Sequence, residues 1–348
     1  MLSVKSFSLA GKLISIFLLM VLLISGCGKK SSSQESAKAG NGGQATYVFK
    51  VGHSQPENHP FQIGLKKFAE LVQEKSKGQI KIEVYASGVL GGTRDRTEGV
   101  KVGTADMELV GSPDLSRWVP QAYLFDLPFL IKDYKQADAI MDGPVGDAIK
   151  KAAAEKGFKL LAYGENGFRH VFNKYKPINT LEDLKGLKLR VYPNQVYTET
   201  FKALGALPMT TDWGELYTAL AQGAVDGAEA AEAHFMAAKF YEAGQKYFSL
   251  TRHTYIPAVL IMNKAKFDKL SPELQKVIQE SAQEAMKYQR EVARKQAEEY
   301  RQNMEEKYGV KVNEVKDLSK FIEAVKPIYD AWVPKIGKDL VEAAQKAS

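Results

Sequence analysis

The 348-residue sequence contains a single cysteine, Cys27, and no long block of like charge. One cysteine excludes a disulfide framework and any metal site built from several cysteines, such as a zinc finger or an iron–sulfur cluster. Lysine and arginine exceed aspartate and glutamate by only 48 − 41 = 7 residues, and the basic residues are scattered. We therefore expect no nucleic-acid partner. The length suits about two domains, and 45% hydrophobic with 26% charged residues is the composition of an ordinary globular protein.

The sequence also lacks the short motifs of several common enzyme classes. It has no Gly-x4-Gly-Lys-Ser/Thr phosphate loop and no His-Glu-x-x-His zinc pair. Residues 52–56 begin like a hydrolase nucleophile turn but end in proline, and residues 88–92 lack the spacing of a dinucleotide-binding loop. No pair of its five histidines has the spacing of metal ligands on one helix face. These absences predict that the protein has no catalytic site, no metal and no cofactor.

The apolar run at residues 13–24 is shorter than the about 20 residues that a membrane-spanning helix needs. It follows a lysine-containing start and ends in Ile24-Ser25-Gly26-Cys27, which looks like a bacterial lipobox. We interpret residues 1–27 as a lipoprotein signal peptide ending at Cys27, whose thiol would take a lipid. An ordinary signal peptide with a chance cysteine is the alternative.

Residues 28–45 contain almost no apolar side chains and are predicted to form a flexible tether. The folded body would then be exported and held by the lipid on Cys27 at the outer face of the cell membrane. A Gram-positive surface and a Gram-negative envelope both fit this expectation.

From Tyr47 onward, short extended segments alternate with amphipathic helical segments, which indicates an α/β fold with largely parallel sheets. The predicted strands lie at residues 47–51, 80–86, 107–110, 158–163, 187–191, near 225, and at 253–262. One helix is predicted to begin at Pro60 and a second to end near Gly103. Further helices are predicted at about 134–155, 195–204 and 213–222.

A much longer helix is predicted between Ser271 and Tyr308. Ser271 is a good N-cap, Pro272 fits the first helical turn, and Gly309 can end the helix. About 37 residues of helix would span roughly 55 Å, which exceeds one small domain, so we expect this helix to brace two. A coiled coil is the alternative, but the apolar positions do not keep a heptad pattern.

Two arginines stand near strand ends. Arg190 closes the predicted strand at residues 187–191, at the carboxyl edge where open α/β sheets present ligands. Arg169 follows the strand at 158–163 within Glu165-Asn166-Gly167-Phe168-Arg169. A guanidinium matches a carboxylate with two parallel hydrogen bonds. Considered alone, either arginine could equally be a solvated surface charge or part of a structural ion pair.

Several segments resemble, in order, the solute-binding proteins of TRAP (tripartite ATP-independent periplasmic) transporters of the DctP type. They are FDLPFL at residues 125–130, KGLKLR at 185–190, GALP at 205–208, WGELYTALAQG at 213–223, AVDGAE at 224–229 and FYE at 240–242. The resemblance implies a two-lobed periplasmic-binding-protein-like (type II-like) α/β fold with a long helix bracing both lobes. Residues 46–166 and about 256–295 would form lobe I, and residues 167–255 and about 296–348 would form lobe II. Hinges are expected near residues 165–170 and 252–258.

The resemblance also implies roles for individual residues. Arg190 would take the carboxylate of the ligand, Arg169 would assist it, and Trp213 would stand near the ligand or in the core. Further candidate contacts lie near strand ends, after glycine-rich turns or after the AVDGAE segment: His53, Arg94, Gly111, Ser112, Asn194 and His234. Many relatives place an asparagine where this sequence has Ala230-Ala231. Whether Glu232 or His234 replaces it is left open.

The function implied is that of an extracytoplasmic solute-binding protein. It would capture a small organic acid, of the C4-dicarboxylate or sugar-acid type, between two closing lobes and deliver it to the membrane subunits of a TRAP permease. Two alternatives use the same kind of pocket: the binding protein of an ATP-driven transporter and that of a sensor kinase system. A third is an extracytoplasmic enzyme that uses His53 or His234 with a carboxylate.

Overall fold

The computed structural model describes residues 45–348. The predicted signal peptide, Cys27 and the predicted tether as far as residue 44 lie outside the described residues. The strands are β1 (Tyr47–Gly52), β2 (Ile80–Tyr85), β3 (Met107–Gly111), β4 (Phe158–Asn173), β5 (Lys188–Val191), β6 (Leu207–Thr210), β7 (Gly227–Ala230), β8 (Tyr247–Asn263) and β9 (Lys311–Glu314).

Helices connect most of these strands. The α-helices are α1 (Pro60–Lys75), α2 (Thr93–Val102), α3 (Ser112–Ser116), α4 (Tyr134–Asp142), α5 (Pro144–Glu155), α6 (Gln195–Ala203), α7 (Leu216–Ala221), α8 (Glu232–Ala237), α9 (Lys264–Asp268), α10 (Pro272–Tyr308), α11 (Ser319–Ala324), α12 (Lys326–Ile336) and α13 (Lys338–Lys346). Short 3-10 helices are η1 (Pro120–Asp126), η2 (Leu181–Leu184) and η3 (Trp213–Glu215).

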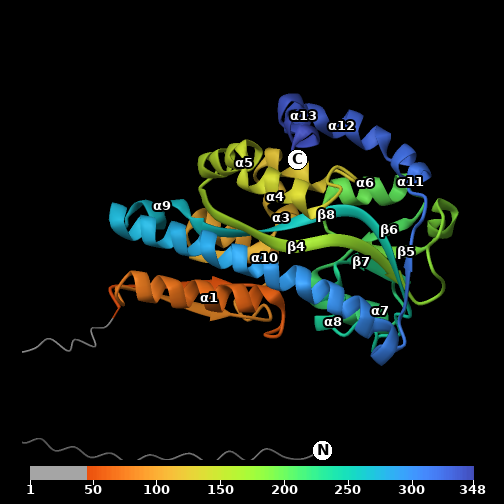
Figure 1. Ribbon diagram of the computed structural model, residues 1–348, viewed down its shortest axis with the longest axis horizontal. Helices are drawn as coiled ribbons and strands as arrows, with labels where there is room; N and C mark the ends of the chain where they lie inside the picture. Colours follow the sequence, from red (N-terminus) through yellow and green to blue (C-terminus); the bar gives the residue numbers. More distant parts are fainter. Residues whose placement is uncertain (1–44) are drawn as a thin grey trace, which may run out of the picture. The chain divides into compact units, whose positions relative to one another are not determined.

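Two long antiparallel strands, β4 and β8, form the centre of the sheet (Figure 1). The sheet order is β2-β1-β3-β8-β4-β7-β5-β6, with β9 also paired to β8. β3 pairs with the end of β8 that contains Ala258–Met262, whereas β7 pairs with the far end of β4, at His170–Asn173. The long strands thus carry one parallel group, β2-β1-β3, at one end and a second, β7-β5-β6, at the other. This arrangement gives the α/β fold two halves.

The structure differs from the sequence-based expectation in two respects. The sheet is mixed: the predicted parallel pairing holds for β1 with β2 and β3, for β5 with β6 and β7 and for β8 with β9, whereas β4 with β8, β3 with β8 and β4 with β7 are antiparallel. The strand predicted at residues 158–163 continues to Asn173. Its register with β8 shifts between Glu165 and Gly167, where Gly167 has a φ of 110°. Such irregularities hide the continuity of a strand from pattern analysis.

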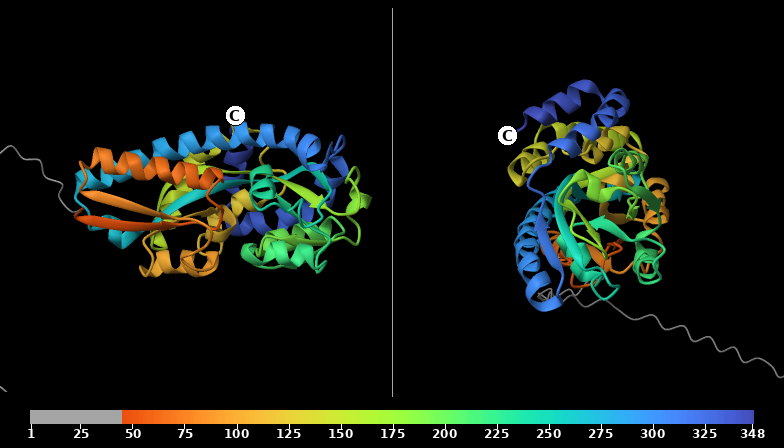
Figure 2. Two further views of the ribbon diagram at one scale, coloured as in Figure 1. Left: turned by 90° about the horizontal axis from the view of Figure 1, so that it is seen from below. Right: turned by 90° about the vertical axis from the view of Figure 1, so that its right-hand side faces the viewer.

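The predicted long helix is confirmed as α10. The Ser271 side chain accepts a hydrogen bond from Leu274 N, Pro272 occupies the first turn, and Gly309 ends the helix in the left-handed conformation with a φ of 64°. Figure 2 shows α10 running beside α1 and on past the second half of the sheet. It packs on α1, β4, α8 and β9, so it is not part of a coiled coil within the described residues.

Three apolar clusters form the core. One lies between α1, the first half of α10 and strands β1–β3, and includes Phe68 and Ile278. A second lies under α7, α8 and the end of α10, and includes Phe235 and Met304. The largest covers the opposite side of the sheet under α4, α5, α6 and the C-terminal helices. α12 contacts η1 and α6, and α13 contacts η1 and α5, so the C-terminal segment touches elements of both predicted lobes.

Candidate functional site

A cavity of about 130 Å³ opens where the ends of the two parallel strand groups face one another across β4. It is lined by Ser54, Gln55, Phe61, Thr93, Arg94, Leu109, Val110, Gly111, Asp114, Arg117, Asn166, Arg169, Arg190, Tyr192, Pro193, Asp212, Trp213 and His234. Most lining residues lie at or after the carboxyl ends of β1, β2, β3, β5, β6 and β7, which is where open α/β sheets bind ligands, and two more belong to β4. Six predicted contacts therefore meet here: Arg94, Gly111, Arg169, Arg190, Trp213 and His234.

Arg190 is a buried cation without a carboxylate partner. Its side chain is 1% exposed, and no ion pair reaches it from residues 45–348. Nε and Nη2 both donate to the backbone oxygen of Thr211, at 3.0 and 2.9 Å, while Nη1 has no hydrogen-bond partner. Burial lowers the pKa of Arg190, although nearby Glu229 opposes this effect. An unpaired guanidinium in a cavity is a strong site for an anion.

Arg169, unlike Arg190, is paired with a carboxylate. Its Nε donates to Glu229 Oε2 and its Nη2 to the backbone oxygen of Glu229, both at 2.6 Å, and its Nη1 donates to Asn166 Oδ1 at 3.2 Å. Burial alone would raise the pKa of Glu229, but the Arg169 charge and the His253 ring, whose Nε2 lies 3.7 Å from Glu229 Oε2, bring it down to about 2. Glu229 therefore neutralises the charge of Arg169. The Arg169 side chain in turn positions Asn166 and the floor of the cavity.

Tyr192 lies between the two arginines. The carbon at the centre of each guanidinium, in Arg169 and in Arg190, is 5.6 Å from the centre of the Tyr192 ring. The Tyr192 hydroxyl donates to Asp114 Oδ2 at 3.1 Å, and burial raises its pKa well above the usual value. A Cβ atom at Gly111 would lie 2.7 Å from this hydroxyl. Glycine at this position therefore leaves room for Tyr192 beside β3.

Aromatic rings form one wall of the cavity. The Trp213 ring centre is 5.8 Å from the Arg190 guanidinium and 5.5 Å from the His234 ring. His234 in turn packs on His59 with 4.4 Å between ring centres. Burial lowers the pKa of both histidines well below 6.5, so both rings are neutral near pH 7. Trp213 and the neutral His234 ring thus form an apolar surface next to the Arg190 cation.

The rim of the cavity carries exposed charges. Arg94 lies in the first turn of α2, Arg117 follows α3, and Asp212 precedes η3, and all three are exposed. Arg117 Nη2 donates to the backbone oxygen of Pro193 at 3.3 Å. Because solvent and salt screen exposed charges, these residues act more weakly on a bound molecule than Arg190 does.

Three predicted contacts do not line the cavity. His53 Nε2 lies 2.7 Å from Gln62 Oε1 beneath β1, in a fully buried position. Ser112 is buried at the start of α3. Asn194 caps α6 by accepting from Val196 N and donates to Asp126 Oδ2 at 2.7 Å. The His53 and Asn194 side chains thus link elements around the cavity.

Sequence reasoning missed three of the polar residues inside the cavity: Asp114, Asn166 and Tyr192. Tyr192 follows Arg190 directly, and Asn166 stands within the segment that pointed to Arg169. Their proximity to the two arginines was a usable signal. Asp114 had none, because it occupies the first turn of a short helix, where an acidic residue is also expected from the helix dipole.

Within residues 45–348, no three His, Cys, Asp or Glu side chains come close enough together to hold a metal ion. None of the helices over the same range is both long and apolar enough to cross a membrane.

Comparisons with known proteins point to one family. The family model for bacterial extracellular solute-binding protein, family 7 (DctP), matches residues 51–335. The chain is 37% identical over 305 residues to the 2,3-diketo-L-gulonate-binding periplasmic protein YiaO of Escherichia coli (strain K12), covering 87% of this chain and 92% of that protein.

Two solved structures are similar as well. A TRAP periplasmic solute-binding protein from Polaromonas sp. JS666, bound to D-erythronate, is 35% identical with a TM-score of 0.82, covering 87% of this chain and 99% of that one. A TRAP periplasmic solute-binding protein from Sulfurospirillum deleyianum DSM 6946, with bound succinate, is 30% identical with a TM-score of 0.81, covering 88% of this chain and 100% of that one.

Proposed function

The chain belongs to the bacterial extracellular solute-binding protein family 7, and we propose that it captures a small organic acid and delivers it to a TRAP permease. The ligand would sit in the cavity between the two strand groups, with its carboxylate on Arg190. Trp213 would pack on its carbon skeleton. The protein itself would make and break no bonds, and it would leave the acid unchanged.

One observation carries this proposal: Arg190 is buried, lines the cavity and has a free Nη1 atom. A buried charge without a partner destabilises a fold, so a protein that keeps one has a use for it. A ligand carboxylate would restore the missing ion pair. Because the cavity has a low effective dielectric constant, that pair would be stronger than one in water.

Closure of two lobes is the expected way to admit and enclose the ligand. We retain the division into residues 46–166 with about 256–295 and residues 167–255 with about 296–348. Between these lobes, contacts join Tyr192 to Asp114 and Asn194 to Asp126. Two of the three register shifts of β4, between Glu165 and Gly167 and between Arg169 and Val171, fall at one proposed hinge segment, and Arg252 with its φ of 44° lies in the other.

The experiment is a thermal-shift screen of the purified protein against hydroxylated and non-hydroxylated carboxylic acids and matched neutral sugars. An acid at 100 times its Kd stabilises the folded state by about 2.7 kcal/mol. Arg190→Met should abolish this shift. Lys188→Met, which removes an exposed cation from the same strand, should preserve it. Shifts from neutral sugars alone, or acid shifts that survive Arg190→Met, would refute the proposed ligand class or the role of Arg190. Mass spectrometry of the recovered acid should show an unaltered molecule.

We further propose that Cys27 carries a lipid, so that the protein acts at the outer face of a membrane. The support is the sequence Ile24-Ser25-Gly26-Cys27 after an apolar run, with the only cysteine of the chain at the expected position. Metabolic labelling with a fatty acid, followed by purification, should label the native protein and not the Cys27→Ser variant. Equal labelling of both, or release of the native protein from washed membranes without detergent, would contradict the anchor.

A further inference from the structure

The interior of the cavity holds one carboxylate, that of Asp114 on α3. Of the two aspartates that line the cavity, Asp212 is exposed at the rim, whereas Asp114 is only partly exposed. Asp114 Oδ2 accepts the hydrogen bond from the Tyr192 hydroxyl at 3.1 Å. Within residues 45–348 its other oxygen, Oδ1, has no hydrogen-bond partner, and no ion pair neutralises the group. Asp114 Oδ1 can therefore accept a hydrogen bond from a bound molecule.

Several groups act on this carboxylate. Burial raises the pKa of Asp114, and the Tyr192 hydroxyl, Arg117, Arg190 and Arg96 counteract this effect, which leaves the pKa at about 6. Asp114 is thus mainly ionised at neutral pH. The cavity accordingly presents one buried cation, Arg190, and one carboxylate to the same ligand.

We propose that Asp114 restricts this site to hydroxylated monocarboxylates: it accepts hydrogen bonds from ligand hydroxyl groups and repels a second carboxylate. The inference rests on the proposed function, in which Arg190 holds the single carboxylate of the ligand. It assigns the selection between the sugar-acid and dicarboxylate types to one side chain.

The selection follows from hydrogen-bond chemistry. An ionised carboxylate only accepts hydrogen bonds, so a hydroxyl group can pair with Asp114 and another carboxylate cannot. Two carboxylates that share one poorly solvated site cannot both remain charged without a large penalty. Discrimination of this kind combines an attractive contact for one ligand with a repulsive one for its competitor. Arg94 and Arg117 are exposed and would compensate a second carboxylate only weakly.

The test compares Kd values, measured by isothermal titration calorimetry, for acids of matched length. The pairs are D-erythronate with tartrate and D-gluconate with glucarate, in which each second acid adds a carboxylate and keeps hydroxyl groups. The native protein should bind the monoacid of at least one pair ten or more times more tightly than the diacid. Asp114→Asn, which can still accept from Tyr192, should reduce that ratio at least tenfold. Asp212→Asn, which removes the same charge at the rim, should change it less than threefold.

The outcomes separate this inference from the proposed function. If Arg190-dependent binding occurs but the native protein takes both acids equally, or Asp114→Asn keeps the native ratio, the selection by Asp114 is refuted and the proposed function stands. If none of these hydroxylated acids binds while another acid of the thermal-shift screen binds through Arg190, the inference is refuted and the proposed function stands; if no acid of either set binds, both are refuted. If Asp114→Asn does not fold, the native protein at pH 5 and pH 8 provides the comparison, because protonation of Asp114 should narrow the preference at pH 5. An unchanged preference there would also refute the inference.

Discussion

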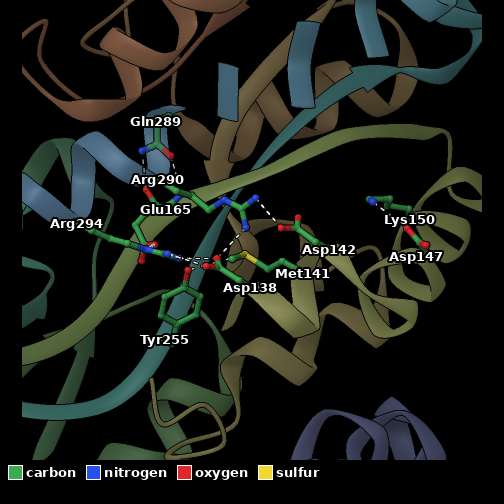
Figure 3. Close-up of polar contacts among 10 residues, drawn as sticks. All are labelled: Asp138, Met141, Asp142, Asp147, Lys150, Glu165, Tyr255, Gln289, Arg290 and Arg294. Carbon is green, nitrogen blue, oxygen red and sulfur yellow. Dashed lines mark hydrogen bonds and ion pairs between the residues drawn. The ribbon is translucent and has the colours of Figure 1, made fainter. Parts of the chain in front are cut away.

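The side-chain amide of Gln289 holds the backbone of Glu165 at both ends. Gln289 Oε1 accepts from Glu165 N at 2.6 Å, and its Nε2 donates to the Glu165 backbone oxygen at 2.9 Å (Figure 3). The residue opposite Glu165 in β8 is Pro257, which has no N–H group to donate. α10 thus supplies hydrogen bonds to the backbone of β4 where β8 cannot, next to the proposed hinge.

We expect Gln289→Ala to destabilise the fold by about 2–4 kcal/mol, because it leaves two buried backbone groups of Glu165 unpaired. Denaturant unfolding measures this loss. Gln302→Ala, an exposed position on the same helix, is the control and should cost less than about 0.5 kcal/mol. Equal losses in the two variants would show that Gln289 does not support the strand.

Arg294 fastens α10 to two other elements. Its Nη1 and Nη2 donate to Asp138 Oδ2 and Oδ1 at 2.8 and 2.7 Å, and its Nε donates to Glu165 Oε2 at 2.7 Å (Figure 3). We expect Arg294→Met to cost about 1–3 kcal/mol: it leaves the buried Glu165 carboxylate without its cation, but Glu165, whose pKa burial raises to about 7, can take up a proton.

Adding Glu165→Gln to Arg294→Met should recover a measurable part of this loss, since the stranded charge is then removed. Lys295→Met, at an exposed neighbouring position, is the control for the helix itself. Unfolding free energies of the single and double variants give the coupling. Strict additivity of the two substitutions would contradict the ion pair.

The fold was predictable where local chemistry decides it. Ser271, Pro272 and Gly309 determine both ends of α10 through capping alone, so its length followed from the sequence. The extent of β4 did not, because Gly164, Asn166 and Gly167 look like a turn when only their neighbours are known. The strand continues there because β8 and Gln289, more than 80 residues away in the chain, supply its partners.

The site was predictable to a similar degree. Arg190 and Trp213 were found from their segments, and both line the cavity. Sequence could not distinguish Arg190 from Arg169, because the difference lies in Glu229, which stands 60 positions from Arg169 and reaches it only in the folded sheet. Asp114 was also missed, because its contact with Tyr192 forms only when the chain is folded.

The two buried arginines should therefore respond differently to the same substitution. Arg169→Met should lower stability by about 3–5 kcal/mol, because Glu229 would remain buried and charged without its partner. Arg190→Met should leave stability unchanged or raise it, because it removes an unpaired buried charge, yet it should abolish ligand binding. Denaturant unfolding without added acid, combined with the thermal-shift screen, tests both. A larger stability loss for Arg190→Met than for Arg169→Met would contradict the assignment.

Asp126 should make stability depend on pH. Its Oδ2 accepts from Ser116 Oγ and Asn194 Nδ2, both at 2.7 Å, whereas its buried Oδ1 has no hydrogen-bond partner among residues 45–348. Burial raises its pKa from 3.8 to about 8; the two hydrogen bonds oppose this shift, and the charge of Asp114 adds to it. The folded state therefore binds this proton more tightly than the unfolded state. The resulting stabilisation is complete below about pH 4 and is lost as the pH rises towards 8.

Asp126→Asn resembles the protonated side chain at every pH, so its Tm relative to the native protein should rise between pH 5 and pH 9. A change of about 1 kcal/mol would appear as a Tm difference of about 2 °C in a domain of this size. Glu108 and Glu165, whose pKa values burial also raises, titrate in both proteins and so cancel in the comparison, whereas Asp114, whose charge acts on Asp126, cancels only in part. Asp212→Asn, at the exposed rim, should give a difference that does not vary with pH. The same flat profile for Asp126→Asn would mean that Asp126 stays charged in the fold, and its hydrogen bonds to Ser116 and Asn194 would then be those of a carboxylate at all working pH values.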